Sequence, residues 1–127
     1  MQRFVFVMLC IVAASLAGSC GYRYNYNRAE AAFQARAEQL RRDAHDSLKI
    51  GTPKEGVLRF FSENDLGGWS DQSHAWGHVY TTRGCSRGLA CSIGSGGGRI
   101  DGVVTLDEKG EVNSEPVVTQ SYAGDCG

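Results

Sequence analysis

Two histidines and an aspartate in this chain have the spacing of metal ligands. His74 and His78 lie four residues apart, as two zinc ligands do on a helix, and Asp71 precedes His74 by three residues. The residues around them alternate between polar and apolar, however, which predicts a β-strand. A strand would separate the two histidines by about 13 Å, too far to share one ion. The sequence therefore predicts no metal site here.

Other residues of chemical interest form weaker patterns. Cys85 or Cys91 beside a histidine would make a thiol nucleophile. The apolar N-terminal segment, however, predicts export to an oxidising compartment, where disulfides are favoured. Residues 94–99 are glycine-rich like a phosphate-binding loop, yet they lack the Gly-Lys-Ser/Thr ending and are expected to be a supple connection between strands. Three carboxylates near a loop show no defined pairing: Glu63, Asp65 and Asp71. We therefore expect no catalysis and no cofactor.

The first twenty residues predict export. Arg3 supplies a short positive region, an unbroken apolar run covers residues 4–14, and small residues lead to Cys20. The apolar part is about 14 residues long, or roughly 21 Å as a helix, against a hydrocarbon core of about 30 Å. The segment is therefore too short to span a bilayer comfortably.

This segment ends Leu16-Ala17-Gly18-Ser19-Cys20. The ending resembles a bacterial lipoprotein signal, although the leucine lies one position upstream of its place in the commonest box, Leu-x-x-Cys. The resemblance implies that Cys20 is diacylated, for example with palmitate, and becomes the new N-terminus. Because Gly21 rather than aspartate follows, it also implies the outer membrane, facing the periplasm. The alternatives are an ordinary secretory signal cleaved near Ala17 to Gly21, which releases a soluble periplasmic or secreted protein, and a retained anchor.

The rest of the chain is enough for one small domain. With residues 1–19 as signal peptide, residues 20–27 are expected to be a flexible tether next to the lipid and residues 28–127 a single domain. The formal net charge of the chain is −1, which offers nucleic acid no basic surface. The expected partners are the membrane, through the N-terminal lipid, and another envelope protein, with no role for nucleic acid.

The five cysteines agree with export. Cys10 leaves with the signal, and if Cys20 is acylated three cysteines remain, which cannot all pair internally. The turn-prone residues between Cys85 and Cys91 favour a bridge between these two, although Cys126 can reach either. If Cys20 is not acylated, four cysteines allow three connectivities and two bridges.

Two helices are predicted before the sheet. Helical periodicity over residues 28–48 places small apolar residues in one stripe: Ala29, Phe33, Ala37, Leu40, Ala44 and Leu48. We expect the stripe to pack on the domain's own sheet, with a coiled-coil dimer as the alternative, and Glu38 to pair with Arg42. Gly51 is expected to cap this helix. Thr52 and Glu55 are expected to form a capping box that starts a second helix, which ends near Asn64.

After Trp69 the pattern alternates as in strands. Trp76, His78, Tyr80 and Thr82 are expected on one face of a strand, and Ala75, Val79 and Thr81 on the other. A shorter strand is expected at 89–93. A strand at 100–106, a turn at 107–110 and a return at 112–120 predict a hairpin. The fold class predicted is α+β, with a long N-terminal helix and a second short helix packed on a three- to four-stranded antiparallel sheet.

Two stretches resemble a known family. Residues 48–57 read Leu-Lys-Ile-Gly-Thr-Pro-Lys-Glu-Gly-Val, and residues 104–112 read Val-Thr-Leu-Asp-Glu-Lys-Gly-Glu-Val. They resemble the helix-opening corner and a later strand of small lipoproteins related to the SmpA/OmlA outer-membrane assembly component. The resemblance implies a helix pair on an antiparallel sheet and a scaffold or binding role in the envelope. The long first helix and the cysteine loop do not belong to that pattern, and no functional residue carries over.

Overall fold

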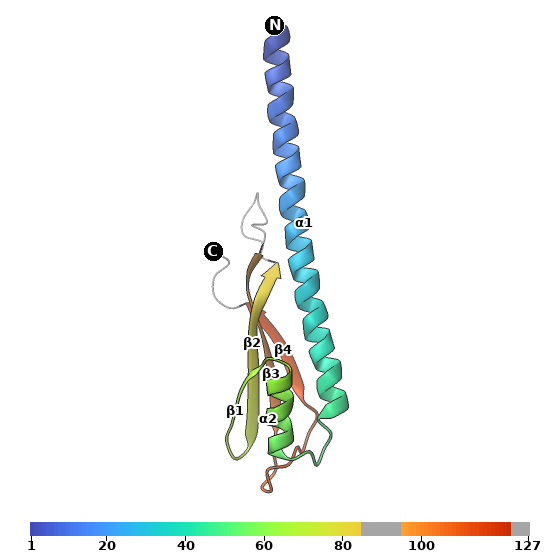
Figure 1. Ribbon diagram of the computed structural model, residues 1–127, viewed down its shortest axis with the longest axis vertical. Helices are drawn as coiled ribbons and strands as arrows, with labels where there is room; N and C mark the ends of the chain where they lie inside the picture. The colour runs from blue at the N-terminus through green and yellow to red at the C-terminus, as the bar shows by residue number, and fades with distance from the viewer. Residues whose placement is uncertain (85–94, 123–127) are drawn as a thin grey trace.

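Two helices are followed by four strands in the computed structural model, which describes residues 1–84 and 95–122, with only the backbone described at 17–26, 95, 96 and 122. The elements are α1 (Gln2–Ser47), α2 (Lys54–Glu63), β1 (Gly67–Ser70), β2 (His74–Gly84), β3 (Ser95–Thr105) and β4 (Val117–Tyr122). The strands form one antiparallel sheet in the order β1-β2-β3-β4. The C-terminal part of α1 and the whole of α2 lie against the sheet, whereas the N-terminal part of α1 projects beyond it (Figure 1). This is the α+β fold that the sequence predicts.

The apolar stripe of α1 packs on the sheet. Its buried members are at most 3 % exposed: Phe33, Ala37, Leu40, Ala44 and Leu48. They share one core with the apolar side of α2 and with the inward side chains of the strands. The stripe is therefore used within the domain, as expected, and is not available for a coiled coil.

Three local expectations for α1 are corrected. The helix begins at Gln2 rather than Arg28, so the backbone of residues 20–27 is helical and not a flexible spacer. This segment contains no proline, and extending a helix that already exists costs far less than nucleating one. Glu38 pairs with Arg41, and the Arg42 guanidinium donates to the side chain of Gln39 instead. The removal of residues 1–19 and the linking role of 20–27 stay predictions.

The corner between the helices is held by backbone hydrogen bonds. The helix ends at Ser47, so Gly51 is not its cap, although Gly51 has the positive φ of +92° that glycine favours. Gly51 N donates to Val112 O at 2.8 Å, and Val112 N donates to Thr52 O at 2.8 Å. With the Thr52 backbone bound in this way, its hydroxyl donates to Lys49 O at 2.6 Å. Thr52 therefore does not cap α2, whose N-cap is Pro53 with no side-chain cap bond, and the predicted capping box is wrong.

The predicted hairpin forms, with an interruption. Asp107 Oδ1 accepts from Lys109 N and Glu111 N, each at 2.9 Å, and Gly110 has a φ of +75°. Val112 bridges to Leu106, but β4 begins only at Val117, paired with Val103. Residues 113–116 thus lie opposite residues 104 and 105, which makes a bulge. Pro116 has no N–H for the ladder, which explains why the return strand is not continuous.

One strand of the sheet, β1, is not predicted by the sequence. The strand expected at 89–93 lies outside the described residues. Residues 95–99 belong to β3, which corrects the expected supple connection.

The glycines of these strands accommodate aromatic rings from the helices. Gly68, Gly77 and Gly102 form one row across three strands under the ring of Phe61, where an added Cβ would come within 2.9, 2.9 and 3.5 Å of it.

Candidate functional site

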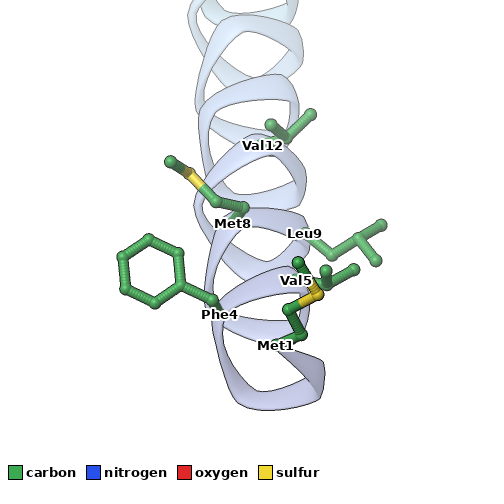
Figure 2. A pocket seen from close by; sticks show the side chains of 6 residues that line it. All are labelled: Met1, Phe4, Val5, Met8, Leu9 and Val12. Carbon is green, nitrogen blue, oxygen red and sulfur yellow. The ribbon is translucent and has the colours of Figure 1, made fainter.

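The apolar side chains of the first sixteen residues are exposed. Nine of them are 55–74 % accessible: Phe4, Val5, Phe6, Val7, Met8, Leu9, Ile11, Val12 and Leu16. Figure 2 shows six side chains that line a shallow hollow here, and all of them come from α1 or from its N-cap, Met1. Because one helix alone provides every wall, this hollow is not a ligand cavity. Among the described residues, no helix has both the length and the apolar character needed to cross a bilayer.

The cysteines are only partly described. Cys10 is an exposed free thiol on α1. Cys20 lies within the helical backbone of α1. The disulfide candidates Cys85, Cys91 and Cys126 lie outside the described residues, so their pairing stays a prediction.

The sheet face opposite the helices, which we call the outer face, is rich in aromatic residues. As predicted, the β2 side chains alternate, and Trp76, His78, Tyr80 and Thr82 point away from the helices. The Trp69 ring stacks on that of Trp76 with centroids 4.1 Å apart, and the His74 ring also stacks on that of Trp76, with centroids 5.2 Å apart. Trp69 and Tyr80 are 57 % and 61 % exposed. Two large aromatic side chains are thus held in place yet remain accessible.

One row crosses all four strands on the outer face. By strand register it consists of Trp69, Trp76, Val103 and Val117, and we call it the apolar row. The ends of the row, Trp69 and Val117, are both more than half exposed. Exposed apolar side chains that lie side by side mark a surface suited to association with another molecule.

A polar pair lies beside the apolar row. On β3, Arg99 Nε donates to Asp101 Oδ1 at 2.7 Å, and the guanidinium lies 5.8 Å from the centroid of the Tyr80 ring. The hydrogen bond to Asp101 and the negative charge of that carboxylate raise the pKa of Arg99. The arginine is therefore firmly cationic, and its charge is balanced by a neighbour on the same strand.

Asp71 forms hydrogen bonds that hold a turn, and the two histidines lie on β2. Asp71 Oδ1 accepts from Ser73 N and His74 N, each at 2.7 Å, in the turn before β2. These two backbone hydrogen bonds lower the pKa of Asp71. His74 and His78 project from the same strand with Trp76 between them. Within the described ranges, no group of three histidine, cysteine, aspartate or glutamate side chains is placed to hold a metal ion.

An ion pair that the sequence does not reveal joins α1 to β2. Glu30 accepts from Arg83 Nη2 at 3.0 Å and Nε at 3.1 Å, and from Gly84 N at 3.1 Å, and both side chains are largely buried. Arg83 also lies over the Phe33 ring at 4.6 Å. Burial alone would raise the pKa of Glu30, but hydrogen bonds from Arg83 and Gln34, the arginine charge and Gly84 N together lower it. We call this pair the latch.

Replacing Glu30 with glutamine is expected to lower the free energy of unfolding by about 1–3 kcal/mol near neutral pH, because hydrogen bonds to a charged group are lost. The folded-state pKa is below the unfolded value of about 4.5. Ionised Glu30 thus stabilises the fold above that value, and the contribution disappears as the pH falls through the folded pKa. Thermal unfolding at several pH values measures this.

The control is Glu38→Gln, which alters an exposed pair on the same helix and is expected to change stability by less than about 1 kcal/mol. A difference between wild type and Glu30→Gln that did not shrink in acid would contradict the assignment of ionised Glu30 to the latch.

Comparison with known protein families, curated proteins and solved structures finds no match to this chain. The resemblances to lipoprotein signals and to SmpA/OmlA-like lipoproteins therefore stay predictions, based on the residues quoted for them.

Proposed function

We propose that this chain is a small exported protein, anchored by lipid on Cys20 in the outer membrane and facing the periplasm, with a structural or protein-binding role and no catalysis. The observation that carries the proposal is the exposed apolar surface of residues 4–16. Such a surface is unfavourable in water by roughly 25 cal/mol per Å² and is matched to an apolar environment. An export signal enters the apolar interior of the membrane during export and is then cleaved off.

The domain core supports this division of the chain. Among the residues whose side chains the structure describes, every buried apolar residue lies at Phe33 or later, so none comes from residues 1–16 or 27–32. The described part of the chain before the tether therefore contributes exposed apolar surface and no core contact. Cleavage before Cys20 would remove that surface and leave the core complete.

The polar side chains support a role without catalysis. Glu30 and Arg83 join two elements, Asp71 holds a turn, and Arg99 and Asp101 neutralise each other. In the described ranges, every deeply buried side-chain nitrogen or oxygen has a hydrogen-bond partner. The outer face instead has the composition of a protein interface, with tryptophan, tyrosine and arginine present and lysine and glutamate absent from its described positions.

The proposal is tested by expressing the full chain in bacterial cells and comparing Cys20→Ala with wild type. We expect wild type to begin at Cys20, to be heavier by its acyl chains, to incorporate labelled palmitate and to partition into detergent. Cys20→Ala should lose all of these. The matched control is Cys10→Ala, which removes an exposed thiol from the signal itself and should leave acylation intact.

Two outcomes would replace the proposal. An unmodified soluble chain cleaved between Ala17 and Gly21 would establish the released periplasmic or secreted module, acting as an inhibitor, an immunity-like factor or a ligand-binding protein. An uncut chain in the cytosol would contradict export altogether.

A further inference from the structure

Strand register places the side chains of the outer face in successive cross-strand rows. Beside the apolar row, His78 on β2 lies opposite Asp101 on β3. In the next row along the strands, Tyr80 on β2 lies opposite Arg99 on β3. In these three adjacent rows the residue on β2 has a chemistry that complements that of its neighbour on β3: an aromatic ring with an apolar or cationic side chain, or an imidazole with a carboxylate.

We propose that a second copy of this chain packs against the outer face, related to the first by a two-fold axis that runs parallel to the strands between β2 and β3. The two sheets then form a sandwich, with the helices on its outside. Aligned packing of this kind places sheets about 10 Å apart with strands within about 30° of each other. The occupant of the exposed sheet face is the same face of another molecule.

With this axis, two residues that are neighbours across the strands of one sheet also face each other between the two sheets. Each position on β2 meets its register partner on β3 of the second copy, and each position on β1 meets its counterpart on β4. Trp76 then packs on Val103 of the second copy, and Trp69 packs on Val117. His78 meets Asp101 of the second copy, and Tyr80 meets Arg99.

Charge favours this pairing. A two-fold interface brings the same surface of two molecules together, so an excess of one charge would repel itself. The described charged residues of the outer face are Arg99 and Asp101, which bear opposite charges and already form a pair. The axis brings Arg99 to the tyrosine ring and Asp101 to the histidine, so no like charges meet. The face is therefore electrostatically complementary to itself.

The direction of the axis also agrees with anchoring, and this step rests on the proposed function. The strands run nearly along α1, and the N-terminus projects from one end of the molecule (Figure 1). An axis parallel to the strands sends both N-termini in the same direction, toward one membrane. The other simple two-fold, along the apolar row, would send them in opposite directions.

The size of the face indicates a modest affinity that membrane attachment strengthens. Four strands about 4.8 Å apart give a face roughly 14 Å wide between the outer strands. The longest strands have 11 residues at about 3.3 Å each, so the face is at most roughly 36 Å long and covers roughly 500 Å². This area is smaller than the about 800 Å² per partner that a standard stable interface buries. Anchoring both copies in one membrane raises their effective concentration and so favours the dimer without new contacts.

The test uses the full chain in cell envelopes, with Val117 replaced by the photoreactive p-benzoylphenylalanine. After illumination, mass spectrometry of a mixture of isotopically light and heavy chains identifies cross-links between copies. We expect a dimer linked from position 117 to the segment around Trp69 of the other copy. The control is the same probe at Asp46, which is exposed on α1 away from the outer face and should yield no dimer.

A second variant tests the apolar row. Val103→Lys places an ammonium group against Trp76 of the second copy, and we expect it to abolish the cross-linked dimer while circular dichroism shows that the domain stays folded. A dimer that persists in folded Val103→Lys would overturn the proposal. So would links from 117 to 117, since these require a different axis, or links only to another protein.

Failure of the dimer is distinguishable from failure of the anchor. An acylated, membrane-bound chain that gives no 117–69 link overturns the dimer and leaves the proposed function intact. An unmodified soluble chain that gives this link at high concentration supports the dimer and removes the anchor.

Discussion

Replacing Phe61 with alanine is expected to lower the free energy of unfolding by about 3–5 kcal/mol. Phe61 is 2 % exposed and connects α2 to the sheet, with its ring over the glycine row of Gly68, Gly77 and Gly102. These glycines have no side chains that could move into the space left by the ring. Since small domains are stable by about 5–15 kcal/mol in total, chemical denaturation should show a large loss.

The control for this substitution is Arg59→Ala, two residues earlier on the exposed side of α2, which is expected to change stability by less than about 0.5 kcal/mol. Equal losses from the two substitutions would show that α2 contributes through its helical backbone rather than through the aromatic ring, and would contradict the role assigned to the glycine row.

Alanine at Gly98 is expected to destabilise the domain by about 1–3 kcal/mol, although glycine to alanine in a strand is normally favourable or neutral. A Cβ at this position would lie 2.5 Å from Phe33 Cε2 and 2.8 Å from Arg83 Cβ. Phe33 is 1 % exposed, and Arg83 is held by Glu30, so neither can retreat freely. The substitution should therefore push α1 away from β3 and loosen the latch, as measured by thermal unfolding.

Gly102→Ala is the matched control, on the same face of the same strand. There the Cβ would lie 3.5 Å from the Phe61 ring, an ordinary van der Waals contact. We expect a stability change between about zero and a gain of 1 kcal/mol. If the two alanines had the same effect, close approach of α1 to the sheet at Gly98 would not be a constraint on the fold.

Sequence periodicity predicts the elements whose side chains have a clear burial pattern. The stripe of α1 repeats with a helical period, and β2 alternates between buried and exposed residues, so both are recognised without knowledge of the fold. The turn at Asp107 is also predictable, because its signal is local: an aspartate that accepts backbone hydrogen bonds and a glycine with positive φ three residues later.

Sequence periodicity does not predict the glycine-rich strands, for a physical reason. Gly67 and Gly68, like residues 95–99, have no side-chain pattern, and their composition is typical of loops. At Gly68 and Gly98 the absence of a side chain is required by the fold, because the rings of Phe61 and Phe33 come from the helices to within contact distance of these positions. The stacking of Trp69 on Trp76 in the candidate site is not predictable from the sequence either, because Trp69 lies on β1. The sequence does not predict the latch, because its two residues are 53 positions apart.

The continuity of α1 sets the height at which the domain is held. With no break between Cys20 and Phe33, a helical rise of 1.5 Å per residue separates a lipid on the first from the start of the core by about 20 Å. A helical rod of this length limits tumbling in a way that a flexible linker does not. For an anchored chain, the accessible edge of the sheet would then stand at a nearly fixed level above the headgroups, and a binding partner must present its own surface at that level.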